Sequence, residues 1–240
     1  MMAPSSSSMQ AGRIIVLSVL AGLIAGGILA ALNVVLLRPV ADRLAESVID
    51  ELIADGEFDE DEFESKMSSA YFAQTAGSLV IGLAAGALIG GVYAFGGSVR
   101  NGFVGIILIA GVAWFVLYAV PAAKYPPSPL AMFDDEVGAR YYPLYAGYLV
   151  VSGIAALGIA AGFRKVTRKN KLFGVAAAYL VVIAVAYFVF PAYDPDSSFD
   201  QSLLNSWRAS FSVAMTAFWF CTGAIAGLLL RYGSAKKSGK

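Results

Sequence analysis

Acidic side chains are the groups in this sequence whose chemistry is best suited to a metal cation. All seventeen Asp and Glu residues lie in three stretches, 42–64, 134–136 and 194–200. Carboxylate oxygens suit hard divalent cations, and the candidate ligands are Glu46, Glu51, Asp134, Asp135 and Glu136. Consecutive residues of a helix do not face one point, so the run at 134–136 is a weak metal site by spacing alone.

A second set of polar residues lies inside apolar runs, where hydroxyl and amide groups could line a path for a solute. These residues are Asn33, Gln74, Thr75, Ser78, Ser152, Thr216 and Thr222. Hydrogen bonds between helices, worth about 0.6 kcal/mol each, are the alternative explanation for all of them. Charged groups at membrane depth would indicate a transport path more strongly, but the apolar runs contain none.

The composition excludes several kinds of catalytic and metal chemistry. The chain has no histidine and a single cysteine, Cys221, so it can form neither an internal disulfide nor a cysteine cluster for a metal. Without histidine the usual catalytic triads are missing, and no GxGxxG, phosphate-loop, HExxH or GxSxG pattern occurs. The sequence therefore predicts neither an enzyme nor a bound cofactor.

The elements that carry these residues are predicted from hydropathy. Of the 240 residues, 58% are hydrophobic and 14% charged, whereas a soluble domain has about 25% charged residues. A hydrocarbon layer of about 30 Å takes roughly 20 helical residues to cross, and six apolar runs are long enough: about 14–37, 71–95, 102–123, 141–163, 172–191 and 209–230. Lipid offers the backbone no hydrogen-bond partner, so such runs form helices. The predicted fold is all-α, a polytopic transmembrane helix bundle of about six spans.

Charge predicts the orientation of these spans in a cell membrane. Five basic residues lie in the loop 164–171, and the positive-inside rule places this loop in the cytoplasm. Alternation of the spans then puts both termini inside, with eleven basic residues inside, six outside and every acidic residue outside. The basic cluster is explained by orientation, so nucleic acid is not expected as a partner. The first apolar run exceeds the about 7–15 residues of a signal peptide, which favours an uncleaved span.

The predicted organisation is one transmembrane domain, residues 13–231, between two cytoplasmic tails. Residues 1–12 form a disordered tail and residues 232–240 a basic one. Outside the membrane, residues 39–70 form an acidic amphipathic segment, with Gly56 ending one helix and the pair Asp59 and Glu62 beginning a second. Its carboxylates either keep the segment in water or collect cations.

Glycines and prolines predict how the spans pack and end. Gly82, Gly86 and Gly90 recur at a spacing of four, which lets helix backbones approach closely, within the chain rather than between two copies. The proline-rich stretches 119–129 and 190–196 are expected to end the third and fifth spans. A stiff, partly extended segment should follow each of them, because proline restricts its own backbone and the residue before it.

Three motifs spread over most of the chain resemble one known family. They are LLRPVADRLAESVIDE at 36–51, KYPPSPLAMFDDEVGAR at 124–140 and SWRASFSVAMTAFWFCTGAIAGLLL at 206–230. Together they are similar to the CbtA family of probable cobalt transporter subunits. The middle motif is the most specific, since hydropathy alone does not generate its prolines, acidic pair and arginine.

This resemblance implies a membrane subunit for cobalt uptake that works with a small one-span, histidine-containing membrane partner. Co²⁺ or another divalent cation would be the cargo. The motif positions to test are Pro39, Glu46, Glu51, Lys124, Pro126, Pro127, Pro129, Arg140 and Arg208.

Three functions stay open from the sequence. The leading hypothesis is a divalent-cation uptake subunit whose acidic outer loops raise the local cation concentration. The alternatives are a structural subunit that moves nothing and a transporter of a neutral organic solute, for which an uncharged polar path costs less than it does for an ion.

Overall fold

A computed structural model describes residues 6–55, 59–96, 102–163, 171–193, 195 and 200–238. Across these ranges every regular element is helical. Six helical stretches are long and apolar enough to cross a membrane: Gln10–Glu46, Phe63–Phe95, Gly102–Lys124, Asp135–Gly162, Lys171–Val189 and Gln201–Tyr232. The prediction of an all-helical chain with six apolar spans is therefore confirmed.

The chain divides into two compact units, which are described separately below. Unit 1 comprises Met1–Trp114 and Ser202–Lys240, and unit 2 comprises Phe115–Gln201. The elements of unit 1 are α1 (Ser6–Leu32), the π-helix η1 (Asn33–Leu37), α2 (Arg38–Asp55), α3 (Glu60–Phe95), α4 (Gly102–Trp114) and α9 (Gln201–Ser238). Those of unit 2 are the π-helix η2 (Phe115–Ala119), α5 (Val120–Lys124), α6 (Leu130–Phe133), α7 (Asp135–Gly162) and α8 (Lys171–Val189). The predicted single domain 13–231 stays a prediction.

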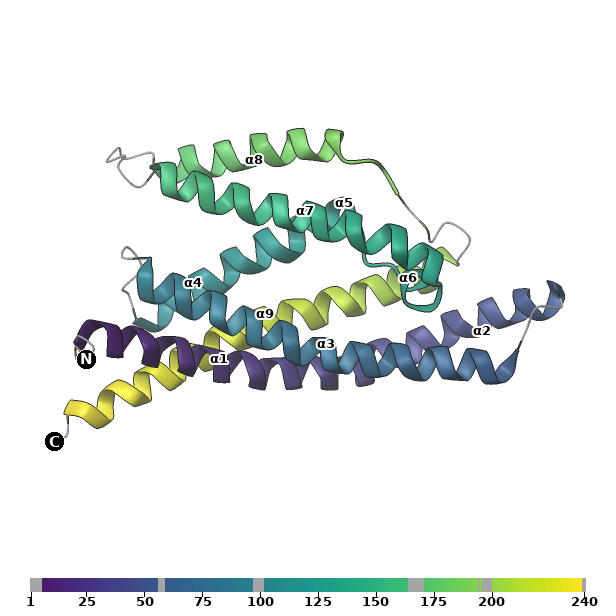
Figure 1. The fold of residues 1–240 in the computed structure, drawn as a ribbon, viewed down its shortest axis with the longest axis horizontal. Helices are drawn as coiled ribbons and strands as arrows, with labels where there is room; N and C mark the ends of the chain where they lie inside the picture. The colour runs from purple at the N-terminus through teal and green to yellow at the C-terminus, as the bar shows by residue number, and fades with distance from the viewer. Residues whose placement is uncertain are drawn as a thin grey trace, which may run out of the picture. The chain divides into compact units, whose positions relative to one another are not determined.

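Unit 1 is built around two long antiparallel helical stretches. Elements α1, η1 and α2 follow one another without a break, and α3 runs back beside them (Figure 1). Helix α3 begins directly after Asp59, whose carbonyl oxygen accepts the N–H of Phe63 at 3.0 Å. The predicted helix start at Asp59 is thus confirmed, whereas Gly56 and the side chain of Glu62 lie outside the described residues. Because the acidic residues also favour helix, α3 extends well beyond the apolar run.

Glycines bring α1 and α3 into backbone contact. A Cβ atom on Gly22 would overlap the carbonyl oxygen of Gly82, and one on Gly86 would overlap that of Ser18. A Cβ atom on Gly26 would lie 2.6 Å from the carbonyl oxygen of Ser78. This arrangement confirms the packing within the chain that the glycine spacing predicts.

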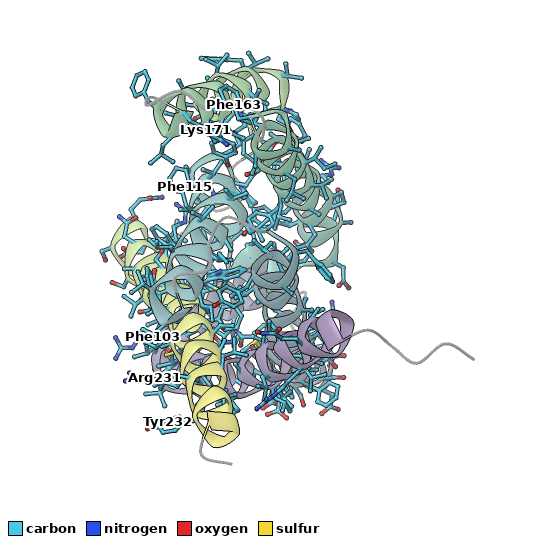
Figure 2. All side chains as sticks on the ribbon, turned by 90° about the vertical axis from the view of Figure 1, so that its left-hand side faces the viewer. Phe103, Phe115, Phe163, Lys171, Arg231 and Tyr232 are labelled. Carbon is cyan, nitrogen blue, oxygen red and sulfur yellow. The ribbon has the colours of Figure 1, made fainter. Side chains whose placement is uncertain are left out.

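Helices α4 and α9 of unit 1 also meet at glycines. A Cβ atom on Gly223 would lie 2.7 Å from the Cβ of Ala110, and one on Gly227 would meet the ring of Phe103. Figure 2 is viewed onto this end of unit 1, where Phe103 lies near the start of α4 and Arg231 and Tyr232 lie on α9. The α4–α9 contact therefore follows the same rule as the α1–α3 contact.

Unit 2 has an aromatic core beneath the proline-rich segment. Tyr125 and Tyr148 are fully buried, and their rings meet edge to face at 6.0 Å. Phe190 packs edge to face on Tyr148 at 5.3 Å, beyond the end of α8. Helices α7 and α8 pack against each other, and Figure 2 labels Phe163 and Lys171 where α7 ends and α8 begins.

The ends of the third and fifth spans agree with the prediction from the prolines. The third helical stretch ends at Lys124, inside the stretch 119–129, and it contains Pro121 just before its end. The preceding residues widen into η2, which relieves the clash of the proline ring with the turn before it. The extended segment comes later, at residues 126–128, and α8 does end at Val189 before Pro191.

The N-terminal tail differs in part from the predicted disorder. Helix α1 already begins at Ser6, so residues 6–12 are helical, because a long helix propagates into flanking residues at little cost. At the other end, α9 continues to Ser238 through most of the predicted basic tail. Residues 1–5, 239 and 240 lie outside the described residues.

The close approach of α1 and α3 yields a testable prediction. We expect Gly22→Ala to destabilise the protein by about 1–3 kcal/mol, because the new methyl group overlaps the backbone of α3. Gly27→Ala is the matched control, since a Cβ atom there meets nothing within 4 Å. It should be neutral, or stabilising by up to about 1 kcal/mol through helix propensity. Thermal unfolding of both variants in detergent, followed by circular dichroism, measures the difference; equal melting temperatures would contradict the packing.

Candidate functional site

Exposed carboxylates lie at one end of unit 1, along α2 and around the start of α3. They are Asp42 and Glu46 on α2 and Asp59, Glu60, Asp61 and Glu64 around the start of α3. Glu51 belongs to α2, but its side chain lies outside the described residues. Arg13 and Arg231 are exposed at the opposite end of unit 1, near the start of α1 and the end of α9 (Figure 1). Unit 1 is therefore electrically polarised along its helices.

A side-chain cluster joins α2 to α3 at the acidic end. The hydroxyl of Tyr71 donates a hydrogen bond to Asp42. The guanidinium of Arg38 lies 4.7 Å from the centre of the Tyr71 ring, and its Nε lies 4.0 Å from a carboxylate oxygen of Asp42. This cluster holds the two long helical stretches together just beyond the glycine contacts.

The carboxylates at 134–136 in unit 2 stabilise the start of α7. One oxygen of Asp134 accepts the N–H groups of Glu136 at 2.8 Å and Val137 at 3.0 Å, which makes Asp134 the N-cap of the helix. Glu136 forms an ion pair with Arg140 at 2.8 Å, one turn along the same helix. Asp135 is exposed, and both it and Glu136 favour a helix N-terminus.

No group of three or more Asp, Glu, Cys or His side chains is arranged to hold a metal ion among the described residues. Glu46 belongs to unit 1 and the 134–136 run to unit 2, and each is exposed to solvent in its own unit. These carboxylates can therefore attract a hydrated cation, because attraction at a distance does not require several ligands that point at one ion.

The structure brings together two of the polar residues predicted at depth in unit 1. The amide nitrogen of Asn33 donates to the hydroxyl oxygen of Ser78 at 3.0 Å, and that hydroxyl donates to the carbonyl oxygen of Gln74 at 2.8 Å. Asn33 and Ser78 are both buried, and Gln74 is half-buried. Thr75 is exposed and donates to the carbonyl oxygen of Tyr71 on its own helix at 3.0 Å. A buried polar pair thus links η1 to α3.

The predicted polar residues of α9 show no such link. Thr222 is fully buried, and its hydroxyl donates to the carbonyl oxygen of Phe218 one turn earlier, at 2.8 Å. Thr216 is half-buried, as is the free thiol of Cys221. The hydroxyl of Thr222 is therefore satisfied by its own helix, as expected for a packing residue.

Ser152 occupies a distinct position in unit 2, facing η2. In the π-helical register each carbonyl oxygen bonds the N–H five residues later, and for Val116 that residue is Pro121, which has no N–H. The hydroxyl of Ser152 donates to the Val116 carbonyl oxygen at 2.5 Å instead. It also shares a hydrogen bond of 2.7 Å with the hydroxyl of Tyr179. A buried hydroxyl network thereby replaces the donor that the proline removes.

Lys124 supplies a second replacement donor in unit 2. Its amine donates to the carbonyl oxygen of Tyr187 at 2.8 Å, and the residue four positions later is Pro191, which cannot donate. The amine also lies 4.3 Å from the centre of the Tyr187 ring. The resemblance singled out Lys124, and the structure gives this residue a packing role at the end of α8.

The proline segment 126–129 is held by tyrosine hydroxyls. Tyr125 donates to the carbonyl oxygen of Pro191 at 2.7 Å, and Tyr141 donates to that of Pro126 at 2.9 Å. Burial raises the pKa of the Tyr125 hydroxyl, which keeps it protonated and able to donate. Pro127 is half-buried, whereas Pro129 is buried and precedes α6. The hydrogen bonds of Tyr125 and Tyr141 therefore fix the position of this segment.

Two further motif positions lie in unit 1. Pro39 is exposed in the first turn of α2, two residues after η1 ends at Leu37. Arg208 is half-buried on α9, and its carbonyl oxygen accepts the hydroxyl of Ser212 at 2.8 Å. Both positions lie close to the ends of predicted spans.

The sequence did not predict that tyrosine hydroxyls form hydrogen bonds with distant groups. Nine of the twelve tyrosines lie within unit 2, and Tyr71, Tyr125, Tyr141 and Tyr179 each donate to or share a hydrogen bond with a distant group. The signal that could have found them is the crowding of tyrosines around the prolines that remove backbone donors.

Comparison with protein families gives one match that covers most of the chain. The family model described as "Probable cobalt transporter subunit (CbtA)" matches residues 11–231. Neither the curated proteins nor the solved structures contain a match.

The Ser152 network yields a prediction that separates it from ordinary packing. We expect Ser152→Ala to cost about 1–3 kcal/mol, because the Val116 carbonyl oxygen then stays buried without a donor. Thr222→Val, the control, removes an equally buried hydroxyl whose acceptor keeps its own helical N–H, and should cost less than about 0.5 kcal/mol. In a Pro121→Ala background the cost of Ser152→Ala should shrink, since alanine restores an N–H at that position. Additive effects in this double-mutant cycle would refute the account.

Proposed function

Because the chain belongs to the CbtA family of probable cobalt transporter subunits, we propose that it is the membrane subunit of a divalent-cation uptake system whose cargo is cobalt. In this proposal the six helices that are long and apolar enough to cross a membrane lie in the cell membrane, and both termini are in the cytoplasm. The sequence contains no nucleotide-binding motif, so in this proposal the energy for uptake comes from a partner or from an ion gradient.

The observation that carries the proposal is the separation of charge within unit 1. Six exposed carboxylates lie on α2 and around the start of α3, against three exposed basic residues there (Arg38, Arg43 and Lys66), and exposed Arg13 and Arg231 lie at the other end. Basic residues are retained on the cytoplasmic side during insertion, whereas acidic residues have little influence on orientation. The acidic end therefore faces outward, toward the source of the cation.

The acidic end acts by raising the local cation concentration. A group of exposed carboxylates creates a negative potential, which attracts cations within about one Debye length. That length is about 10 Å at 0.1 M salt. In unit 2 the charges of Asp134, Asp135 and Glu136 add to the outward-facing set. Such a surface speeds arrival of the cation without binding it tightly.

The partner we propose is a small, single-span membrane subunit that carries histidine. Cobalt binds imidazole more tightly than carboxylate alone, and this chain contains no histidine. A partner with imidazole groups would select the metal, while this chain forms the membrane path. The competing proposal of a purely structural subunit draws support from the lack of a three-ligand metal group among the described residues.

Orientation gives the first test of the proposal. After Cys221→Ala, a single cysteine at Glu60 should react with a membrane-impermeant maleimide in intact cells, because this exposed position lies at the acidic end. A cysteine at Tyr232, exposed near the end of α9, should react only after the membrane is permeabilised. The two sites lie at opposite ends of unit 1, so the reverse pattern would invert the orientation and remove the cation-gathering role.

Neutralising the carboxylates tests their role in uptake. We expect Glu46→Gln combined with Asp134→Asn, Asp135→Asn and Glu136→Gln to raise the apparent KM for Co²⁺ about twofold to tenfold in low salt, with the maximal rate unchanged. The difference should vanish near 1 M salt, where the Debye length is about 3 Å. Asn keeps the N-cap that Asp134 provides, so the start of α7 is preserved.

The matched control for this variant changes charge at the other end. Arg13→Gln with Arg231→Gln alters exposed charges of unit 1 but leaves the acidic end intact, so the apparent KM should not rise in a variant whose maleimide labelling shows the wild-type orientation. Uptake by the four-carboxylate variant that equals wild type at low salt would remove these carboxylates from the mechanism. If cells of the native host take up Co²⁺ equally well with and without the wild-type chain, the hypothesis of a structural subunit is favoured.

A further inference from the structure

We infer that the seam between η1 and α3 is an entry site for a partly hydrated cation, with the amide oxygen of Asn33 as its innermost protein ligand. This inference rests on the proposed function and deepens it, because it names where the cation first leaves bulk water. The groups that form the site are Asp42, Tyr71, Gln74, Ser78 and Asn33.

Oxygen-bearing groups descend from the acidic end into the span along this seam. Tyr71, Gln74 and Ser78 lie at positions i, i+3 and i+7 of α3 and therefore share one face, over about 10 Å of helix. At the outer end Tyr71 bonds Asp42 of α2, and at the inner end Ser78 bonds Asn33 of η1. Exposure falls in the same direction, from exposed Asp42 to buried Asn33 and Ser78.

The orientation of the Asn33 amide follows from the hydrogen bonds of Ser78. The Ser78 hydroxyl gives its proton to the Gln74 carbonyl oxygen, so toward Asn33 it can only accept, and the Asn33 nitrogen must face it. The amide oxygen is left buried, and among the described residues it has no hydrogen-bond donor. Asn33 as a whole is 6% exposed. A buried acceptor without a donor is complementary to a positive ligand.

The π-helix adds a second departure from regular hydrogen bonding at the same place. The N–H of Arg38 bonds the carbonyl oxygen of Asn33, five residues earlier, and the next donor in that register would come from Pro39. Because proline has no N–H, the carbonyl oxygen of Val34 lacks its partner in the π register. Such local π-helices occur frequently at functional sites.

Deeper in the span the seam is closed by glycine backbone contacts. A Cβ atom on Gly26 would lie 2.6 Å from the Ser78 carbonyl oxygen, and one on Gly22 would overlap Gly82. The polar seam therefore meets the acidic end at the cluster of Arg38, Asp42 and Tyr71 and is blocked below Asn33. A cation that reaches Asn33 can go further only by another route or after α1 and α3 separate.

Another buried polar atom in unit 1 does not make an equivalent site. The hydroxyl of Ser18 is also buried without a partner among the described residues, where it packs beside Gly86 and Gly90. A serine hydroxyl can rotate onto the carbonyl oxygen one turn earlier on its own helix, whereas the Asn33 amide is held by Ser78. Of these two residues, Asn33 alone combines a held orientation with a line of oxygens that leads to the acidic end.

The chemistry of the site indicates a weak interaction with a divalent cation. Its one carboxylate, Asp42, lies at the outer end and is already paired with Arg38 and Tyr71, and the inner oxygens are neutral, so the cation keeps several of its waters. Weak binding fits an entry position, because conduction needs a cation that can leave as well as arrive. Titration of the purified full-length protein in lipid nanodiscs with Co²⁺, by isothermal calorimetry, measures this interaction directly.

Substitutions at Asn33 test the assignment. We expect Asn33→Leu to weaken Co²⁺ binding at least about tenfold, since it removes an oxygen contact to a charged group. Asn33→Asp should tighten binding by a similar factor, because it adds a negative charge at the same place. Thr75→Val is the control, since Thr75 is exposed on α3 and bonds its own helix. Thermal unfolding checks the fold, and Asn33→Leu should change the melting temperature little, because loss of the hydrogen bond to Ser78 is offset by removal of an unsatisfied polar atom.

The outcomes separate this inference from the proposed function. If wild-type cells take up Co²⁺ and Asn33→Leu leaves both uptake and binding unchanged, the entry site is wrong and the proposed function stands. Unchanged binding together with a raised melting temperature would show that the amide holds only water, which also overturns the inference. If Asn33→Leu does not fold, failure of Asn33→Asp to tighten binding is decisive against it. If wild type shows no uptake, the proposed function itself fails.

Discussion

Hydrogen bonding of backbone groups where no water is present is the constraint on which this structure depends. A proline within or just after a span removes one N–H donor and leaves a carbonyl oxygen without its helical partner. In unit 2, neighbouring helices supply the donor: Ser152 bonds the carbonyl oxygen of Val116, and Lys124 bonds that of Tyr187. Since lipid provides no hydrophobic drive for helices to associate, these polar contacts and the aromatic core determine which helices pack together.

This constraint also explains what the sequence could and could not predict. The six spans were predictable because hydropathy is a local property, and so was the helix start at Asp59, which depends on adjacent residues. The donor for Val116 was not predictable, because Ser152 lies 36 positions away and only the packing of α7 brings it near. For the same reason the sequence shows that Pro121 removes a donor but not that η2 lets the helix continue past it. At the candidate site, the carboxylates were visible in the sequence, whereas the Asn33–Ser78 pair required the register of two helices 45 positions apart.

The α1–α3 pair combines two kinds of contact that have opposite consequences for a polar solute. Glycines at Gly22 and Gly82 bring the backbones together and exclude any solute from the middle of the seam. Toward the acidic end the small residues give way to Asn33, Ser78 and Gln74, which are larger and polar. The change occurs beside η1, where the wider π turn shifts the register of all the residues that follow. That shift is what allows Asp42 to face Tyr71 while Asn33 faces Ser78.

Because the chain has no histidine, the proposed function assigns selection of the metal and passage through the membrane to two different proteins. An imidazole site within the spans would bind cobalt tightly and release it slowly, whereas neutral oxygens and exposed carboxylates discriminate poorly but exchange fast. The proposed function therefore places selection of the metal before passage, on the proposed histidine-carrying partner. The energetics of the chain agree with this order, because a single uncharged amide at depth costs far less to bury than an ionised group. In the proposed function the affinity of this chain for the cation can therefore stay low enough for the cation to leave.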